Sequence, residues 1–332
     1  MAASCQILEP SDETLNFCAR TLGTGRLVAV PTETVYGLAA NALDELAVRR
    51  IFEVKGRPFV DPLIVHLQDA SMAESCACLN SRFHTLAKHF WPGPLTVLLH
   101  KRPKIPSIVT AGLPGVALRV PSHPVLQELL SRIDFPLAAP SANPFGYVSP
   151  TRPEHVRRTL GDRLTCVLDG GPCPHGLEST IVDLRNETKP AILRHGPLEK
   201  TRIEELLQHP LDDLSGYNSA GAQCSPGRLK KHYSPKTNIR LLEHGTSPEA
   251  LKKRPPNAEN AYILCRRPKV EADTSHVFWL SEDGDLATMA HNLFDLIQRL
   301  DDVGYKRLHL EEAPEEGIGR AINDRLRRAA AQ

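Results

Sequence analysis

Short apolar runs alternate with longer segments of helical apolar periodicity between residue 10 and about residue 207. The short runs predict strands and the longer segments predict amphipathic helices. The expected strands are Leu27–Val30, Leu63–Leu67, Leu95–Leu99, Val116–Val120, Leu137–Ala139, Cys166–Leu168, Thr180–Leu184 and Ile192–Leu193. The expected helices are Asp44–Val54, Ser81–Phe90, Pro124–Arg132 and Pro153–Leu160. The spacing Thr201-Arg-Ile-Glu204 matches a capping box and predicts the start of a further helix.

This order of elements predicts an α/β fold. Strand follows strand without an intervening helix near residues 166–193, and the strands are short. Both features favour a twisted, mixed sheet with some antiparallel pairs over a doubly wound parallel sheet. We therefore expect residues 1–207 to form one domain around a mixed, curved sheet.

The alternation stops at residues 208–237, where polar residues, Gly and Pro replace the apolar ones. This segment is expected to be a linker. The alternation then restarts, and the expected elements are strand Ile239–Leu242, helix Pro248–Lys253, strands Ala261–Cys265 and Val277–Leu280, helix Leu286–Leu300, strand Arg307–Leu310 and helix Ile318–Ala330. Residues 238–332 are thus expected to form a small Rossmann-like domain, and they contain no Gly-x-Gly-x-x-Gly loop that would indicate a dinucleotide.

Composition narrows the class of protein. The 40 Lys and Arg residues nearly balance the 39 Asp and Glu residues, for a net charge of +1. Because no overall field attracts the chain to nucleic acid or to an anionic membrane, any anion site has to be local. The amino terminus has no basic and apolar leader, and no apolar stretch reaches about 18 residues. We expect a soluble, cytoplasmic protein with no membrane segment.

The eight cysteines, at positions 5, 18, 76, 78, 166, 173, 224 and 265, show no Cys-x-x-Cys pair and no Cys/His spacing of a zinc site. This pattern argues against structural zinc and against a disulfide framework. We expect reduced thiols, most of them buried.

Small hydroxyl, amide and cationic side chains cluster in turns that follow apolar runs, at Thr32-Glu-Thr34, Lys55-Gly-Arg57 and Ser141-Ala-Asn143. Such positions lie at strand ends, where α/β sheets bind their ligands, and this chemistry indicates a polyphosphate site. Lys55 and Arg57 are expected to project freely from a loop after a helix, although cations there also suit the helix dipole. Ser141 and Asn143 lie between two prolines, and a simple Asx or Ser turn is the alternative.

Two residues within apolar strands carry weaker signals. His66 closes the run Pro62–His66, where a histidine is as easily a satisfied core residue as a functional one. Arg119 lies inside Val116–Val120, so its guanidinium needs an anionic partner. A substrate carboxylate and a structural Asp or Glu would serve equally well.

The linker contains one unusual stretch, Lys230-Lys-His-Tyr-Ser-Pro235. Its aromatic and basic residues could close over a nucleotide as a lid, and the alternative is a solvated basic segment. The chain has no Gly-x-x-x-x-Gly-Lys-[Ser/Thr], Gly-x-Ser-x-Gly or His-Glu-x-x-His motif. P-loop nucleotide hydrolysis and the common hydrolase chemistries are therefore not indicated.

Together these motifs resemble the YrdC-type threonylcarbamoyl-AMP synthases. The matching segments are Pro31-Thr-Glu-Thr-Val-Tyr-Gly-Leu38, Lys55-Gly-Arg57 with Pro62-Leu63, Trp91-Pro-Gly-Pro-Leu-Thr96, Leu118-Arg-Val-Pro121, Ala139-Pro-Ser-Ala-Asn143, and Glu178-Ser-Thr-Ile-Val-Asp183 with Arg194 and Gly196. The Lys-x-Arg and Ser-x-Asn pairs are the hallmark of that family. His232-Tyr-Ser-Pro235 and Gly317–Leu326 are similar to the long, two-domain form, so the resemblance covers nearly the whole chain.

The resemblance implies a fold and a reaction. The fold would be a twisted α/β domain with a large basic cavity, followed by a small Rossmann-like domain that docks through the linker. The reaction would convert L-threonine, bicarbonate and ATP into L-threonylcarbamoyl-AMP and pyrophosphate. A separate tRNA threonylcarbamoyltransferase would receive the adenylate and modify the adenosine beside the anticodon.

The resemblance also implies roles for individual residues. Lys55, Arg57, Ser141 and Asn143 would surround phosphate and bicarbonate. The residues carried over to threonine are Thr32, His66, Arg119, Ala139 and Ser179, with Arg119 on the carboxylate. The further residues assigned to ATP are Phe59, Gly115, Ser149, Arg194 and Tyr233. A magnesium ion is expected on the phosphates, although no Asp/Glu cluster declares a dedicated metal site.

Two other classes of function remain open at this point. A tRNA- or double-stranded-RNA-binding module would use a basic cavity, but the balanced charge and the absence of RNP-type aromatics make RNA binding secondary. A carbamoyl-transfer or maturation domain detached from a larger enzyme would be expected to carry zinc-finger cysteines and an acylphosphatase-like segment, and neither occurs.

Overall fold

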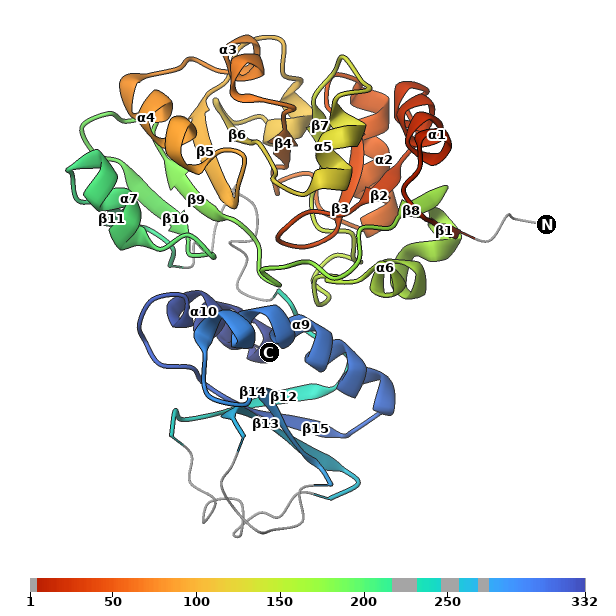
Figure 1. Ribbon diagram of the computed structural model, residues 1–332, viewed down its shortest axis with the longest axis vertical. Helices are drawn as coiled ribbons and strands as arrows, with labels where there is room; N and C mark the ends of the chain where they lie inside the picture. The colour runs from red at the N-terminus through yellow and green to blue at the C-terminus, as the bar shows by residue number, and fades with distance from the viewer. Residues whose placement is uncertain (1–4, 217–231, 246–256, 268–274, 332) are drawn as a thin grey trace.

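The computed structural model describes residues 5–216, 232–245, 257–267 and 275–331, and it contains two β-sheets with helices packed around them (Figure 1). The first sheet has 11 strands and the second has four. The strands of the first sheet are β1 (Gln6–Leu8), β2 (Val28–Val30), β3 (Gly37–Asn41), β4 (Ile64–His66), β5 (Leu95–His100), β6 (Gly115–Arg119), β7 (Leu137–Ala138), β8 (Cys166–Leu168), β9 (Thr180–Asp183), β10 (Ala191–Arg194) and β11 (Asp212–Asp213). Its α-helices are α1 (Asp12–Gly23), α2 (Glu45–Lys55), α3 (Ala73–Cys76), α4 (Ser81–Phe90), α5 (Pro124–Leu130), α6 (Pro153–Leu160) and α7 (Lys200–Leu207).

The first sheet is mixed, as the sequence predicts. Its strand order is β1-β8-β2-β3-β7-β4-β6-β5-β9-β10-β11. Strand β4 runs parallel to β6, whereas β5 and β7 run antiparallel to their neighbours β6 and β4. The β4–β6 register sets His66 directly beside Arg119. A bridge between Gly37 and Ser141 brings two of the predicted polar turns together.

Helix α2 shows how the sequence fixes local structure near these turns. The Asp44 carboxylate accepts hydrogen bonds from the amides of Leu46 and Ala47 and so caps the first turn. Gly56 ends the helix in the left-handed region, at φ 62°, where glycine carries no steric penalty. The chain therefore reverses between Lys55 and Arg57.

The capping box predicted at Thr201 is wrong. Helix α7 begins one residue earlier, at Lys200, and its N-cap Glu199 makes no side-chain hydrogen bond. The Glu204 carboxylate instead accepts a hydrogen bond from the amide of Leu211, after the helix has ended. The spacing was right for a cap, but the acidic side chain is used to hold the following turn.

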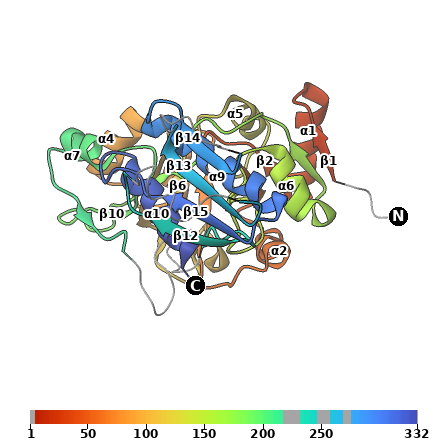
Figure 2. The same ribbon diagram turned by 90° about the horizontal axis from the view of Figure 1, so that it is seen from below.

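The second sheet consists of β12 (Asn238–Leu242), β13 (Asn260–Arg266), β14 (Val277–Ser281) and β15 (Arg307–Glu311). All its pairs are parallel, in the order β12-β15-β13-β14. Helices α9 (Leu286–Val303) and α10 (Gly319–Ala330) lie between this sheet and the first one (Figures 1 and 2). The expected helix Pro248–Lys253 lies outside the described residues.

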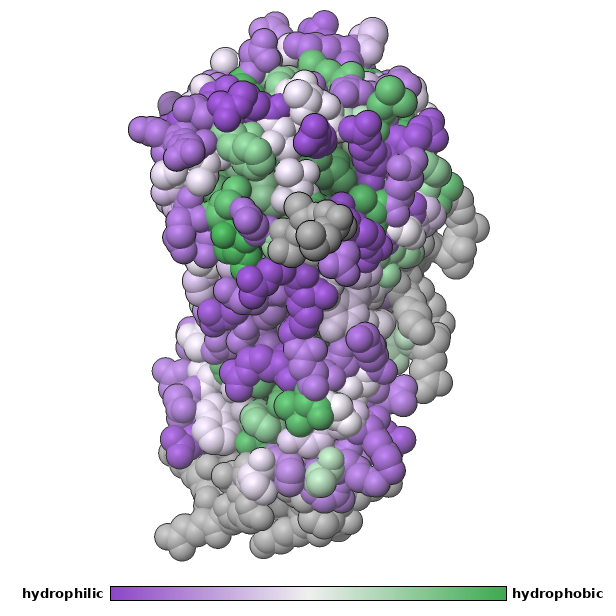
Figure 3. All heavy atoms as spheres, turned by 90° about the vertical axis from the view of Figure 1, so that its right-hand side faces the viewer, coloured by the Kyte–Doolittle hydropathy of each residue, from purple (hydrophilic) through white to green (hydrophobic). Residues whose placement is uncertain are grey.

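Helices α9 and α10 lie between the two sheets, and side chains of α9 contact the first domain directly. Arg152 pairs with Asp295 at 2.7 Å, and the Tyr147 hydroxyl donates to Asp301 at 2.7 Å. Gly176 is so close to α9 that an added Cβ would lie 2.5 Å from the carbonyl oxygen of Ala290. Hydrophilic residues dominate this junction on the face shown in Figure 3. The helices of the four-stranded sheet therefore pack directly on the domain that contains the 11-stranded sheet.

Across the described ranges, no helix combines the length and the apolar character that crossing a membrane would require.

Candidate functional site

A cavity opens where the ends of β4, β6, β9 and β10 meet the turns after β2 and β7. Its volume is about 50 Å³ when only the space open to a water-sized sphere is counted, and about 520 Å³ when the open space at its mouth is included. The lining residues are Thr32, Thr34, Val35, Gly37, Arg57, Ile64, His66, Arg119, Ala139, Pro140, Ser141, Glu178, Ser179, Arg194 and His232. Of the residues singled out by sequence, the cavity thus contains Thr32, Arg57, His66, Arg119, Ala139, Ser141, Ser179 and Arg194.

Arg119 and His66 form one wall of this cavity. Arg119 Nη2 lies 2.7 Å from Glu33 Oε1, and Nη1 donates to the Thr34 hydroxyl at 2.9 Å. The anionic partner that its buried position requires is therefore Glu33. Burial and the nearby Arg119 cation lower the pKa of His66 to about 3, so this imidazole is neutral at physiological pH.

Hydroxyl groups line the neighbouring surface. The Thr32 hydroxyl donates to the carbonyl of Val35 at 2.6 Å and lies 2.8 Å from the Thr34 hydroxyl. The Ser179 hydroxyl lies 2.7 Å from that of Thr96. These buried contacts fix each side chain in one orientation, which suits a site for a small polar ligand.

The expectation that Lys55 and Arg57 project freely from a loop is wrong. Lys55 is the last residue of α2 and only 3% exposed, and its ammonium donates to the carbonyls of Ser141 and Asn143. Arg57 lines the cavity, but it pairs with Asp61 at 2.9 Å and donates to the carbonyl of Pro62 at 2.8 Å. Burial lowers the pKa of both, well below its usual range in the case of Lys55. The αL turn at Gly56 folds these side chains inward.

The Ser-x-Asn pair is divided between two tasks. Ser141 lines the cavity. Asn143 lies behind it, 1% exposed, and its amide nitrogen donates to the carbonyls of Pro144 and Tyr147 at 2.9 Å each. Asn143 Oδ1 accepts no hydrogen bond from the described residues, so these contacts are not an Asx turn. Through its amide nitrogen Asn143 instead holds the Ser141 loop in shape, together with Lys55.

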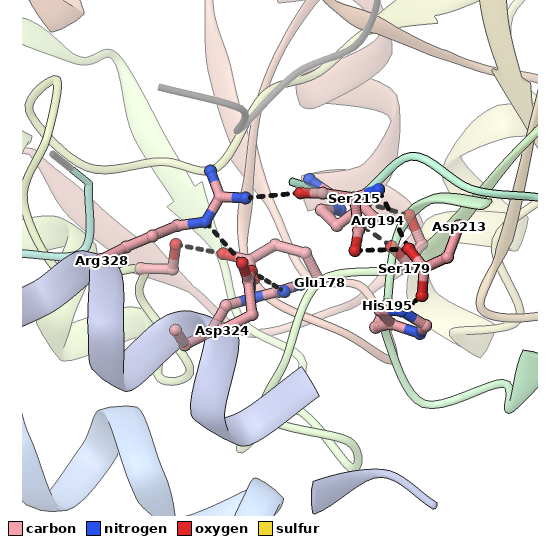
Figure 4. Close-up of polar contacts among 10 residues, drawn as sticks. Glu178, Ser179, Arg194, His195, Asp213, Ser215, Asp324 and Arg328 are labelled. Carbon is pink, nitrogen blue, oxygen red and sulfur yellow. Dashed lines mark hydrogen bonds and ion pairs between the residues drawn. The ribbon is translucent and has the colours of Figure 1, made fainter. Parts of the chain in front are cut away.

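Arg194 and Glu178 line another part of the cavity, and Figure 4 shows both with their polar contacts. Arg194 donates to the Ser179 carbonyl at 3.0 Å and hydroxyl at 3.1 Å, and burial lowers its pKa to about 10. Glu178 accepts a hydrogen bond from the Ser149 hydroxyl at 2.6 Å. Ser149 itself does not line the cavity and contacts it through Glu178.

The linker motif reaches the site through His232, which lines the cavity. Tyr233 lies behind it, with ring centroids 4.1 Å apart, in the left-handed region at φ 62°. The Tyr233 ring stacks on Phe294 of α9 at 5.4 Å. Lys230 and Lys231, included in the expected lid, lie outside the described residues.

Two residues assigned to ATP lie away from the cavity. Phe59 is 47% exposed and contacts Phe52 and Arg49. Gly115 begins β6, whereas Arg119 ends it, and four residues of strand separate the two by about 13 Å. An added Cβ at Gly115 would meet the side chains of Arg185 and Leu98 at 3.1 Å, so close packing accounts for this glycine.

One group of possible metal ligands lies in the second sheet. Among the described residues, His244, Cys265 and Glu311 place ligand atoms within 4.8 Å of one another at the carboxyl edge of the second sheet. The Glu311 oxygens accept hydrogen bonds from the amides of Gly245 and Cys265, which gives that carboxylate a structural role. None of the three residues lines the cavity. The seven described cysteines are all free thiols.

Several cavity residues were not assigned roles from sequence. Glu178 and His232 lay within quoted motifs, and their charge and aromaticity were a usable signal. Thr34 lies two residues after Thr32 in the same turn. Only this spacing could have indicated that both side chains point into the cavity. Val35, Gly37, Ile64 and Pro140 present no chemistry that sequence reasoning could have distinguished from packing.

Comparison with known proteins agrees with this geometry. A family model described as "Telomere recombination" matches residues 20–196, and one described as "Threonylcarbamoyl-AMP synthase, C-terminal domain" matches residues 198–331. A threonylcarbamoyl-AMP synthase of Pyrococcus abyssi is 37% identical over 95% of this chain and 94% of its own length. One of Bacillus subtilis is 36% identical over 97% and 94%.

A solved structure gives the same picture. Pyrococcus abyssi Sua5 complexed with L-threonine superposes with a TM-score of 0.89 at 34% identity, covering 98% of this chain and 97% of that one. Both parts of the fold are therefore shared. The chain belongs to the threonylcarbamoyl-AMP synthase family, in its long, two-domain form.

Proposed function

We propose that this protein is an L-threonylcarbamoyladenylate synthase, a nucleotidyltransferase that converts L-threonine, bicarbonate and ATP into threonylcarbamoyl-AMP and pyrophosphate. The observation that carries the proposal is the cavity in which Arg57, Arg119 and Arg194 converge with fixed hydroxyls, in a chain of this family. Pyrophosphate release is the direct test. Release should require threonine and bicarbonate together, and release independent of threonine would contradict it.

The threonine would bind at the wall formed by Arg119. Its carboxylate would accept hydrogen bonds from the remaining N–H groups of the Arg119 guanidinium, whose Nη2 and Nη1 already contact Glu33 and Thr34. Thr32, Ser179 and the backbone at Ala139 would contact the amine and hydroxyl. His66, being neutral, offers hydrogen bonds there without adding a cation.

The triphosphate would bind towards Arg57, Arg194 and Ser141. Lys55 and Asn143 would act on phosphate and bicarbonate by shaping the Ser141 loop, since both hold its backbone. Ser149 and Tyr233 would support the nucleotide from behind Glu178 and His232. Phe59 and Gly115 do not line the cavity, so their predicted contacts with ATP would lie where the nucleotide extends beyond it.

The chemistry needs position and charge more than a proton-transfer chain. The threonine amine nitrogen forms a bond to the carbon of bicarbonate, and water leaves to give a carbamate. A carbamate oxygen then forms a bond to the ATP α-phosphorus while the bond from that phosphorus to the β-phosphate bridging oxygen breaks. Two negative charges approach each other in this step, and buried guanidinium groups aimed at the phosphates reduce the barrier.

ATP would enter as its magnesium complex. Glu178 is the one carboxylate among the described lining residues, and it is already bonded to Ser149 and Arg325. Magnesium commonly keeps waters and phosphate oxygens as ligands, so the complex needs no further carboxylate here. The ion would neutralise charge on the leaving pyrophosphate.

The segment His232–Pro235 would close over the bound nucleotide. His232 already lines the cavity, and Tyr233 anchors the segment on α9. A closed segment would exclude water from the labile mixed anhydride.

The adenylate would pass to a separate tRNA threonylcarbamoyltransferase. Both proteins would act in the cytoplasm, which supplies ATP and keeps thiols reduced. Direct binding of tRNA or double-stranded RNA is a secondary hypothesis. A gel-shift titration at physiological salt would test it, because affinity through phosphates alone falls steeply with salt.

A further inference from the structure

Glu178 is a buried carboxylate on the surface of the catalytic cavity. It is 7% exposed and precedes Ser179, which opens into β9. Its Oε1 accepts the hydrogen bond from Ser149, and its Oε2 accepts one from Arg325 Nε at 3.1 Å. Arg325 belongs to α10, so the ion pair of a cavity residue is supplied by the second domain.

Arg325 is itself fixed from several sides. It is 1% exposed, and its Nη1 donates to Asp324 at 2.8 Å. Asp324 also accepts a hydrogen bond from Arg328 Nε at 2.8 Å, as Figure 4 shows. The Arg325 guanidinium lies 5.5 Å from the ring centroid of Tyr233 in the linker. The helix, the linker and the cavity wall thus meet at one side chain.

The charge of Glu178 depends on this arrangement. Burial alone would raise the pKa of Glu178, but the Arg325 and Arg194 cations lower it below its usual range. A buried carboxylate that loses its partner destabilises the fold, and pairing with another cation lowers that cost. Arg194 is the other cation that acts on Glu178, and it holds the carbonyl and hydroxyl of Ser179.

We propose that Arg325 is a positioning residue of the catalytic centre: it occupies the Glu178 carboxylate, so that Arg194 stays on Ser179 and on its side of the cavity. This inference rests on the proposed function. Without Arg325, the Glu178 carboxylate forms an ion pair with Arg194. Arg194 then releases the carbonyl and hydroxyl of Ser179 and moves away from the phosphate side of the cavity. The second domain then contributes to catalysis through one side chain, in addition to holding the linker.

The experiment measures steady-state formation of threonylcarbamoyl-AMP by the full chain and its variants. Arg325→Met should lower kcat about a hundredfold, the effect expected when reacting groups are displaced by about 1 Å. Arg325→Lys should recover part of the loss because it restores the charge. The double variant Arg325→Met with Glu178→Gln should be more active than Arg325→Met alone, since no unpaired carboxylate competes for Arg194.

The pH profile separates positioning from simple docking. In Arg325→Met the pKa of Glu178 rises, so kcat should increase as the pH falls and the carboxyl becomes neutral. That increase should be absent from the wild type and from the double variant. Docking alone predicts no such dependence.

Arg152→Met is the matched control, because Arg152 pairs with Asp295 across the same junction but does not line the cavity. It should lower the melting temperature and leave kcat within about twofold. Equal impairment of the double variant and Arg325→Met, with unchanged pH profiles, would overturn the inference. A wild type that forms no adenylate would instead overturn the proposed function.

Discussion

Buried arginines occur in two regions of this molecule, and their surroundings differ. In the cavity, Arg57 and Arg194 lie where burial outweighs the attraction of nearby acids, and their pKa values are lowered. At α10, burial also acts on Arg325, but nearby Tyr233 and the carboxylates of Glu178 and Asp324 outweigh it and raise its pKa. Burial therefore prevails at Arg57 and Arg194, whereas the surrounding groups prevail at Arg325.

The difference indicates which buried cations an anionic ligand would stabilise most. An anion that enters the cavity relieves the cost of burying Arg57 and Arg194 and should bind with stabilisation of the fold. An anion gains nothing comparable at Arg325. Burial identifies neither group by itself, because all three residues are at most 6% exposed.

The largest effect is expected for Arg194→Met. Loss of a charge-assisted contact to phosphate should weaken ATP binding by roughly 10- to 150-fold, as measured by calorimetry. The melting temperature of the ligand-free protein should change little, since this cation is costly to bury. Arg132→Met, which removes a surface arginine paired with Asp12 and Glu128, serves as control. Unaltered ATP affinity in folded Arg194→Met would remove the distinction between the two regions.

Arg119→Lys should separate threonine from ATP. Lysine keeps the charge but loses the planar fork, so threonine affinity should fall by about tenfold while ATP affinity stays near normal. Titration calorimetry with each ligand checks this. Equal loss of both affinities would assign Arg119 to the Glu33 ion pair and to structure alone.

Tyr233→Ala should affect the product more than binding. Removing the ring that stacks on Phe294 frees the His232 segment, and the net yield of adenylate should fall severalfold through hydrolysis. Threonine affinity should remain within about twofold. Yield is followed by chromatography of the reaction mixture with time. A yield that falls only in proportion to threonine binding would leave the segment as a tether.

The smallest effect is expected at the junction, for Asp295→Asn. Burial would raise the pKa of Asp295, but His155 and Arg152 lower it to about 2. A depressed carboxyl pKa stabilises the fold above about pH 4, and this contribution is lost as the pH falls towards 2. Urea unfolding at pH 6 should show a loss of about 1 kcal/mol, allowing for solvent screening at a partly exposed ion pair. The difference from wild type should shrink by pH 3, and a constant difference would contradict the ion-pair explanation.

Sequence periodicity recovered most of the elements, because their apolar runs are rich in Val, Ile and Leu. Strand β3 was missed since its sequence, Gly-Leu-Ala-Ala-Asn, consists of small residues with low strand propensity. Helix α1 was missed although Ser11 and Thr14 form a reciprocal cap, because its outer face is largely polar. The secondary-structure propensity of a segment does not indicate which of its faces other elements will cover.

The site was only partly predictable for a different reason. The predicted strand ends indicated where Arg119 and Ser141 would lie. No local sequence pattern indicated that the Lys55 side chain would point inward and bind two carbonyls. Arg325 lies in a helix with several other arginines, and nothing in that spacing distinguishes it from a solvated residue. Its partner, Glu178, is 147 residues away, a contact that only tertiary structure defines.

That separation has a consequence for synthesis on the ribosome. At translation rates of about 5–20 residues per second, the 147 residues between Glu178 and Arg325 take roughly 7 to 30 s to emerge. Throughout that interval the nascent first domain holds the Glu178 carboxylate without its α10 partner. Helix α10 therefore supplies the partner of Glu178 only after the first domain has emerged, and we expect nascent chains stalled before residue 325 to bind a fold-reporting antibody before they can make adenylate.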